Sequence, residues 1–291
     1  MMSDPPVSIE HQQGDDQIYL WNTQESTPSR QSDPRVDSVY STPSDETFLI
    51  GLEEQEQISV QGSASALRIA GHSRYSDEPM VALSQYAARL LALVNGKQGD
   101  GWLFRNEVTG RDVQGVIEEV SIFDRRGAKY EFDYSVTFRA GQGMMPYKPI
   151  QPEPVDPSDT AYIAGQNLHE IEEQWINKKQ KLKVYPFAMS EFEENGITAQ
   201  TGATREITLK GSIPGDESVR TEFDDTIRAR TGQNITVDYE SAFPGTTLEM
   251  MVSSFDTTRQ AGWTRLGEYH LELVEGTVGS VSGDPGAEDP Q

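Results

Sequence analysis

QISVQG (Gln57–Gly62) and EITLKG (Glu206–Gly211) decide the fold, because one pattern opens two halves of the same chain. In each stretch apolar residues alternate with polar ones and a glycine closes the run. Such alternation is typical of a β-strand with one buried and one exposed face. The two stretches therefore predict two β modules that begin alike.

A segment with helical periodicity follows each opening strand. In the first half Asp77 and Pro79 suit a cap and first turn, and the apolar residues that follow are spaced three or four apart, at Leu83, Ala87, Leu90 and Val94. In the second half one helical face carries Val219, Phe223 and Ile227. We expect one helix in each module.

Three more strands are expected in the same order in both halves. The pairs are a short strand (Trp102–Phe104; Ile235–Tyr239), a long strand (Val116–Asp124, VIEEVSIFD; Leu248–Asp256, LEMMVSSFD) and a closing strand (Tyr134–Gly141; Tyr269–Gly276). The first copy is longer, and its surplus fits the polar loop Leu67–Glu78. This common order indicates an internal duplication.

Composition divides the rest of the chain. Residues 1–45 are rich in Ser, Pro, Gln and Asp, which predicts an extended arm without its own core that is laid on another subunit. Residues 143–180 begin with a segment of five prolines and are expected to form a linker with a short helix. The predicted organisation is arm 1–45, module 46–142, linker 143–180, module 181–277 and acidic tail 278–291. The fold class is mainly β with one helix per module (α+β).

The charge balance excludes some partners. The chain has 291 residues, with 24 Lys and Arg against 47 Asp and Glu, a net charge of −23 that disfavours general nucleic-acid and membrane-surface binding. Only eight of those cations are lysines and there is no cysteine, which together with the acid excess resembles proteins of salt-loving archaea; the alternative is an ordinary acidic protein of a mesophile. No apolar stretch reaches the roughly 18 residues that a membrane span needs, and the first residues lack the basic and apolar regions of a cleavable signal, so we expect neither a span nor such a signal.

Catalytic and metal-binding patterns are weak. The four histidines are not spaced as metal ligands, and GHSRY (Gly71–Tyr75) lacks the closing glycine of a nucleophile elbow. Paired carboxylates carry little information in so acidic a chain. We expect no enzyme activity, no cofactor and no metal site, and glycosylation at Asn234 stays open.

The strand–helix–meander order resembles the tandem β-sandwich or barrel modules of tail-tube, distal-tail and baseplate-hub proteins of tailed viruses, over approximately Glu46–Gly141 and Lys181–Gly276. With the acidic composition, the resemblance implies a structural tail protein of a haloarchaeal virus. It would form a ring of three or six chains in the virion tail, contact other tail proteins, and meet DNA only as it passes through an acid-walled channel. The position as hub, distal-tail or tube protein stays open.

Candidate interface residues follow from this reading. A basic cluster between the modules, a docking patch or simply a solvated turn, comprises Lys178, Lys179, Lys181 and Lys183. Aromatic candidates for contacts between subunits are Tyr134, Tyr269 and Trp21. The alternative function is a carbohydrate- or receptor-binding β-sandwich, for which exposed tryptophans would serve as sugar platforms: Trp21, Trp102, Trp175 or Trp263.

Overall fold

A computed structural model describes most of both halves. The described residues are 4–11, 16–25, 29–42, 45–95, 98–99, 101–125, 130–144, 149, 160–163, 166–168, 171–185, 196–199, 203–214, 217–240, 246–259 and 266–275. The predicted acidic tail, 278–291, and most of the proline-rich segment lie outside them.

Strands dominate the described residues. The first half contains β1 (Val7–His11), β2 (Gln17–Tyr19), β3 (Gln24–Glu25), β4 (Ser29–Thr42), β5 (Asp45–Ser65), α1 (Ala66–Ala70), α2 (Pro79–Ala92), β6 (Trp102–Asn106), β7 (Arg111–Arg125), β8 (Glu131–Ala140) and β9 (Gln142–Gly143). The second contains β10 (Thr160–Ile163), β11 (Gln166–Asn167), β12 (Ile171–Lys179), β13 (Leu182–Tyr185), β14 (Gly196–Ala199), β15 (Thr204–Pro214), α3 (Glu217–Arg228), β16 (Asn234–Glu240), β17 (Thr246–Arg259) and β18 (Leu266–Glu275). The mainly β fold is confirmed.

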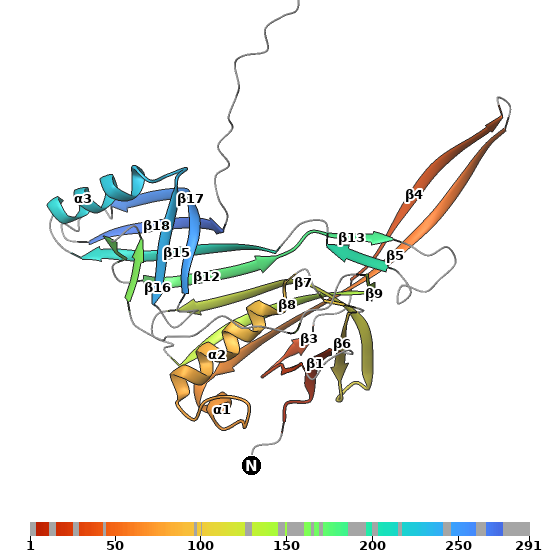
Figure 1. Ribbon diagram of the computed structural model, residues 1–291, viewed down its shortest axis with the longest axis horizontal. Helices are drawn as coiled ribbons and strands as arrows, with labels where there is room; N and C mark the ends of the chain where they lie inside the picture. Colours follow the sequence, from red (N-terminus) through yellow and green to blue (C-terminus); the bar gives the residue numbers. More distant parts are fainter. Residues whose placement is uncertain are drawn as a thin grey trace, which may run out of the picture.

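The two halves share one strand order. In the first, the spatial order is β5–β8–β7–β6, and in the second it is β15–β18–β17–β16, with every neighbouring pair antiparallel. In both halves the opening strand therefore lies beside the closing strand, and a helix separates opening and second strands in the chain. Figure 1 shows the halves as two neighbouring groups of strands.

Strand β12 joins these groups into one sheet. One of its edges pairs with β7 and the other with β15, both antiparallel. This corrects the prediction of a short helix in 143–180, because residues 171–179 are extended and Gln174 and Ile176 alternate into the interior. β13, β14 and β9 form a separate three-stranded sheet.

One face of the large sheet carries a continuous apolar row across the joint. Directly opposed residues on successive strands are all buried: Tyr134, Ile122, Ile176, Ile207, Leu273 and Val252. We call this the inner face, and the opposite one the outer face. Burial of such a row stabilises both halves together.

The predicted helices are confirmed, and they contribute to the core. In α2, which begins at Pro79, the expected apolar residues Leu83, Ala87 and Leu90 are buried, and the fourth, Val94, is buried two residues beyond the end of the helix. In α3, Phe223 and Ile227 are buried, whereas Val219 is 38% exposed. The Phe223 ring contacts the Phe255 ring edge-on, and its centroid lies 5.4 Å from the centroid of the Tyr269 ring.

Residues 7–20 belong to the first module, so this part of the predicted arm packs on its own chain and not on another subunit. β1 pairs with β2 and with β6, and Val7, Ile9, Ile18 and Leu20 are buried in the core. These residues alternate in short strands that complete a core they could not form alone.

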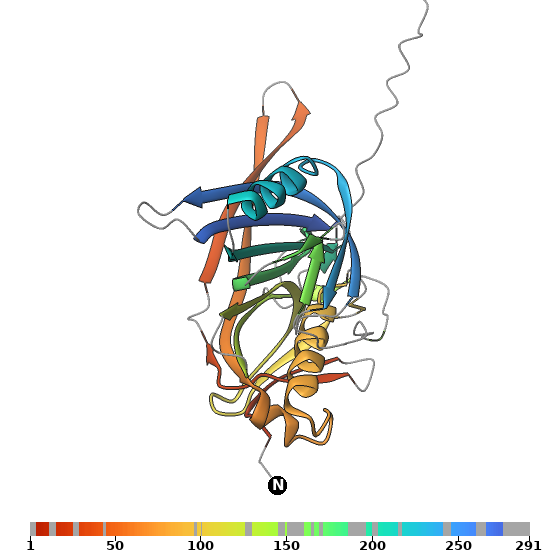
Figure 2. The same cartoon turned by 90° about the vertical axis from the view of Figure 1, so that its left-hand side faces the viewer.

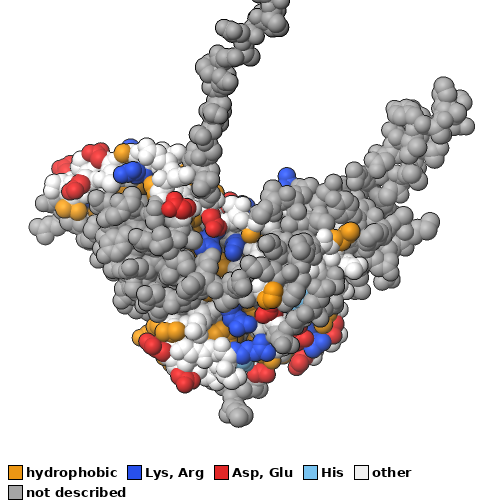
Figure 3. All heavy atoms as spheres, viewed as in Figure 1, with side chains coloured by type: hydrophobic (Ala, Val, Ile, Leu, Met, Phe, Trp, Pro, Cys, Tyr) orange, Lys and Arg blue, Asp and Glu red, His pale blue; other side chains and the backbone are white. Residues whose placement is uncertain are grey.

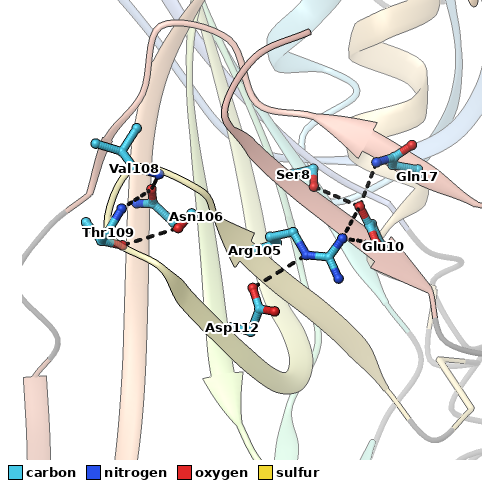
Figure 4. Close-up of polar contacts among 8 residues, drawn as sticks. All are labelled: Ser8, Glu10, Gln17, Arg105, Asn106, Val108, Thr109 and Asp112. Carbon is cyan, nitrogen blue, oxygen red and sulfur yellow. Dashed lines mark hydrogen bonds and ion pairs between the residues drawn. The ribbon is translucent and has the colours of Figure 1, made fainter.

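Polar contacts fasten this segment to the β6–β7 hairpin (Figure 4). Glu10 accepts a 2.7 Å hydrogen bond from the Gln17 amide and pairs with Arg105 at 3.3 Å. Arg105 also reaches Asp112 at 3.5 Å. In the turn that follows β6, the Asn106 side chain accepts hydrogen bonds from two backbone amides.

A long hairpin of β4 and β5 extends from the body of the molecule (Figures 1 and 2). Only the end of β5, from Gln57 to Ser65, pairs with β8, whereas residues 45–57 pair with β4. Residues 45–56 of β5 therefore have β4 as their one strand partner among the described residues. A two-stranded hairpin is marginally stable on its own in water.

Candidate assembly interface

A glycine opposite a tyrosine marks the same place in each half. Gly62 on β5 faces Tyr134 on β8, and Gly211 on β15 faces Tyr269 on β18. Both tyrosines are buried, and burial raises the pKa of each hydroxyl well above its usual value, so both stay neutral.

The glycine at the first of these places is required by packing. The Tyr134 hydroxyl donates a 2.6 Å hydrogen bond to the carbonyl of Trp21. A Cβ added to Gly62 would lie 2.5 Å from that hydroxyl oxygen and 2.6 Å from that carbonyl oxygen. The pair thus ties the N-terminal segment to the module.

Each half has a hollow beside its glycine–tyrosine pair. The first, about 400 Å³, is lined by residues of β3, β5, β7 and β8 and neighbouring positions, including Gln24, Gln61, Ser121, Phe123 and Asp133. The second, about 590 Å³, is lined by residues of β12, β15, β17 and β18, including Glu173, Lys210, Asp256, Thr258 and Glu268. When positions are counted from the glycine–tyrosine pairs, the five residues named for the first hollow correspond, in the same order, to the five named for the second.

A β-bulge also recurs at one position. The pairing of β7 with β8 shifts between Ile117 and Glu119, and that of β17 with β18 shifts between Val252 and Ser254. Before the shift, Ile117 faces Phe138 in the first half and Val252 faces Leu273 in the second. Phe138 and Leu273 each lie four residues after the tyrosine of their own strand. A bulge bends its strand and increases the local twist.

Two buried glutamines satisfy the backbone at the first bulge. Gln98 accepts a 2.8 Å hydrogen bond from the Ile117 amide and donates one of 2.9 Å to the Ile117 carbonyl. Gln180, just after β12, donates a 2.6 Å bond to that same carbonyl. The end of β12 is thereby anchored where β7 bends.

The structure corrects one detail of the sequence alignment. The endings SIFD and SSFD of the two long strands do not coincide, because Phe123 faces Asp133 whereas Phe255 faces Leu271. Measured from the paired tyrosines, Phe123 corresponds to Thr258, and Phe255 corresponds to Val120. Phe123 is half-buried on the outer face and Phe255 is buried beneath α3.

A stacked pair of aromatic rings and a lysine on the outer face stabilise the joint between the halves. The ring of Phe123 on β7 stacks on that of Trp175 on β12, with centroids 4.7 Å apart and planes 22° apart. The Lys210 ammonium on β15 lies 4.7 Å from the centroid of the Trp175 ring. Lys210 also pairs with Glu173 at 3.4 Å. Three strands from both halves thus meet at one tryptophan.

The basic cluster lies partly within this joint. Lys178 is half-buried on β12 and faces Val120, and exposed Lys179 pairs with Glu206 at 2.8 Å. Lys181 is exposed just beyond the strand, and the side chain of Lys183 lies outside the described residues. Docking through the lysines stays a prediction, with Lys181 the member best placed for it.

The aromatic candidates are core residues of this chain. Trp21, Tyr134 and Tyr269 are buried, at 6%, 3% and 2% exposure, so they cannot serve as surface contacts in this conformation. Trp102 is buried as well, and Trp175 is covered by Phe123 and Lys210. Trp263 lies outside the described residues. The tryptophans that the structure describes form no exposed sugar platform.

Several strands pair on one side only within the described part of the chain, and two of these open edges adjoin the repeated strands. On β17, residues 246–251 pair with β16, but residues 254–259 pair on one side only, with β18. Strands β3 and β4 likewise pair on one side only, with β5. Sequence reasoning missed these edges, because hydrophobic alternation identifies strands without identifying their neighbours.

Acidic side chains gather over α3 (Figure 3), which carries Glu217, Glu222, Asp224 and Asp225. Asp224 accepts hydrogen bonds from Arg228, which lower the pKa of its carboxyl. Among the described residues there is no group of three or more His, Asp and Glu arranged to hold a metal ion. The described helices include none that is both long and apolar enough to cross a membrane.

Comparison with known proteins gives structural similarity at a distant level. No protein-family model and no curated protein matches the sequence. A solved chain from the tail of an empty GTA particle with C6 symmetry matches 39% of this chain and 82% of its own length, at 11% identity and a TM-score of 0.30. Similarity at this level does not establish a shared fold.

Proposed function

We propose that this chain is a non-enzymatic structural subunit of a virus tail, in which two related β modules per chain assemble with further copies into a ring around the tail channel. The observation that carries the proposal is the joint at β12. It extends one sheet from the first module into the second, and within the described structure residues 254–259 of β17 and the strands β3 and β4 pair on one side only.

Internal duplication is part of the proposal. Its support is the common strand order, the common glycine–tyrosine pair, the bulge at one shared position and the two corresponding hollows. A chain that already joins one module to the next has the geometry that another copy could repeat. Contacts that join unlike surfaces close into rings where the rotation permits.

The outer face is suited to a channel wall that does not hold DNA. Three of its basic side chains, Arg139, Lys179 and Lys210, are each paired with a glutamate. Because paired cations attract phosphates less, and the chain's net charge is −23, DNA would slide past without adhering. A lumen lined by dense, unpaired Lys and Arg would contradict this assignment.

The test is the mass of the purified protein by light scattering coupled to size exclusion, at about 2 M and about 0.1 M KCl, since salt screens the acidic self-repulsion. A discrete trimer or hexamer at high salt is expected, and electron microscopy should show a ring. A trimer favours the hub position and a hexamer the distal-tail or tube position. A monomer at both salt concentrations and high protein concentration contradicts self-assembly.

A further inference from the structure

The pairing of β12 with β7 and β15 indicates how the unpaired strand edges of this chain could pair with another copy. Asn177 of β12 faces Glu206 on β15 and, on its other edge, Ser121 on β7. The Ser121 hydroxyl and the Asn177 side-chain oxygen are 3.4 Å apart. Strand β12 therefore pairs through one edge with the second module, which follows it in the chain, and through the other edge with the first module, which precedes it.

The segment that precedes the first module occupies the corresponding place. Ser29 of β4 faces Gln57, which is the first residue of QISVQG, just as Asn177 faces Glu206, the first residue of EITLKG. Gln24 of β3 faces Gln61, as Glu173 faces Lys210. Strands β3 and β4 therefore lie on β5 as β12 lies on β15, but with their second edge unpaired in the described structure.

The partner of that second edge can be identified in the same way. Ser121 faces Ser135, the residue after Tyr134, and Asp256 faces His270, the residue after Tyr269. Asp256 therefore holds the position on β17 that Ser121 holds on β7. It lies at the centre of the open stretch 254–259 and is exposed.

We infer that residues 254–259 of β17 accept the β3–β4 edge of a second copy of this chain, with Ser29 of one copy opposite Asp256 of the next. The new joint repeats the β7–β12 joint between chains, and backbone hydrogen bonds along an exposed edge supply its affinity. The inference rests on the proposed function and adds to it the two edges and their register.

Side chains at the open edge are consistent with an edge that is exposed before assembly. Thr257 and Thr258 hold the positions that Ile122 and Phe123 hold in the internal joint. Ile122, whose strand is paired with β12, is 1% exposed, whereas both threonines are exposed. Polar residues lower the tendency of an open edge to aggregate, so a single chain can stay in solution until the next copy binds.

Disulfide trapping tests the register, because the chain contains no cysteine of its own. The single variants Ser29→Cys and Asp256→Cys are mixed at about 2 M KCl under mild oxidation. We expect a disulfide-linked dimer that a reductant converts back to monomers. Its yield should be roughly tenfold above that of the control mixture of Ser29→Cys with Thr257→Cys, because the side chain at position 257 lies on the other face of the strand. The double variant Ser29→Cys/Asp256→Cys should give a ladder that ends at the ring.

The variant Ser121→Cys/Asn177→Cys is the internal control, and peptide mass spectrometry should find its disulfide within single chains. If that control closes, the wild-type protein forms a ring, and the Ser29–Asp256 pair still gives no dimer, the edge assignment is overturned and the ring remains. If no dimer forms and the wild-type protein is a monomer at both salt concentrations, the inference and the proposed function both fail.

Discussion

Trp175 is the residue through which the two halves of the sheet should depend on each other, and its truncation is the most informative perturbation. Trp175→Ala removes the indole that stacks on Phe123 at 4.7 Å and carries the Lys210 ammonium at 4.7 Å. Both neighbours lie on other strands, one in each half of the molecule. The variant therefore weakens the joint without removing any backbone hydrogen bond.

The magnitude follows from three contributions. A half-buried indole loses about 100 Å² of contact area, worth about 2.5 kcal/mol at about 25 cal/mol per Å². The stacked pair adds about 0.5–1.5 kcal/mol, and the cation over the ring adds about 0.5–1 kcal/mol at an exposed site. We expect the free energy of unfolding to fall by about 3–4 kcal/mol, since such contributions are not fully additive.

The assay is urea unfolding at constant high KCl, followed by far-ultraviolet circular dichroism, for Trp175→Ala, Phe123→Ala and the double variant. We expect a coupling free energy of about 0.5–1.5 kcal/mol between the two rings. As a control, Trp175→Ala is combined with Phe223→Leu in α3, and these two changes should be additive within about 0.5 kcal/mol. A Trp175–Phe123 coupling below about 0.3 kcal/mol would refute the reasoning.

Four further predictions concern the modules and the charge of the chain. Gly62→Ala should destabilise by about 1–3 kcal/mol, because its Cβ would lie 2.5 Å from the Tyr134 hydroxyl, and Gly62→Ala/Tyr134→Phe should recover part of that loss in the same urea assay. Phe223→Ala should cost about 3–5 kcal/mol by emptying the contact between α3 and its sheet, whereas an unchanged midpoint would contradict that packing. The melting temperature should rise by several degrees between about 0.1 M and 2 M KCl, since screening relieves a net charge of −23, and calorimetry that shows no rise would contradict a halophilic character. The pKa of Asp224 is lowered by its arginine partner, so its stabilising effect is present above the usual pKa of about 4 and is lost as the pH falls through the lowered value; Asp224→Asn should flatten that part of the pH–stability profile.

The succession of strands and helices along each module could be predicted from sequence because its signals are local. Alternation in QISVQG and EITLKG, and the spacing of Leu83, Ala87 and Leu90, reflect which side of each element is buried. These elements also contain most of their stabilising contacts within one module. Local pattern and tertiary environment therefore agree, and the prediction succeeds.

β12 and the N-terminal strands could not be predicted, because their structure depends on distant neighbours. IEEQWINKK has only Gln174 and Ile176 fully buried, and it is extended because β7 and β15 pair with its two edges. Likewise, Val7 and Ile9 are buried only because β6 and α2 provide the remainder of the core. Trp21 was singled out as a contact residue, but no local signal showed that its own module covers it.

The shared strand β12 also has a consequence for synthesis on the ribosome. The first module ends with β8 at Ala140, but the stretch of β7 that pairs with β12, from Glu119 to Arg125, has no second neighbour until residues 171–179 emerge. During that interval a nascent chain presents an unpaired edge that another nascent chain could bind. Translation that is fast across residues 141–179 should therefore favour correct folding over aggregation on crowded polysomes.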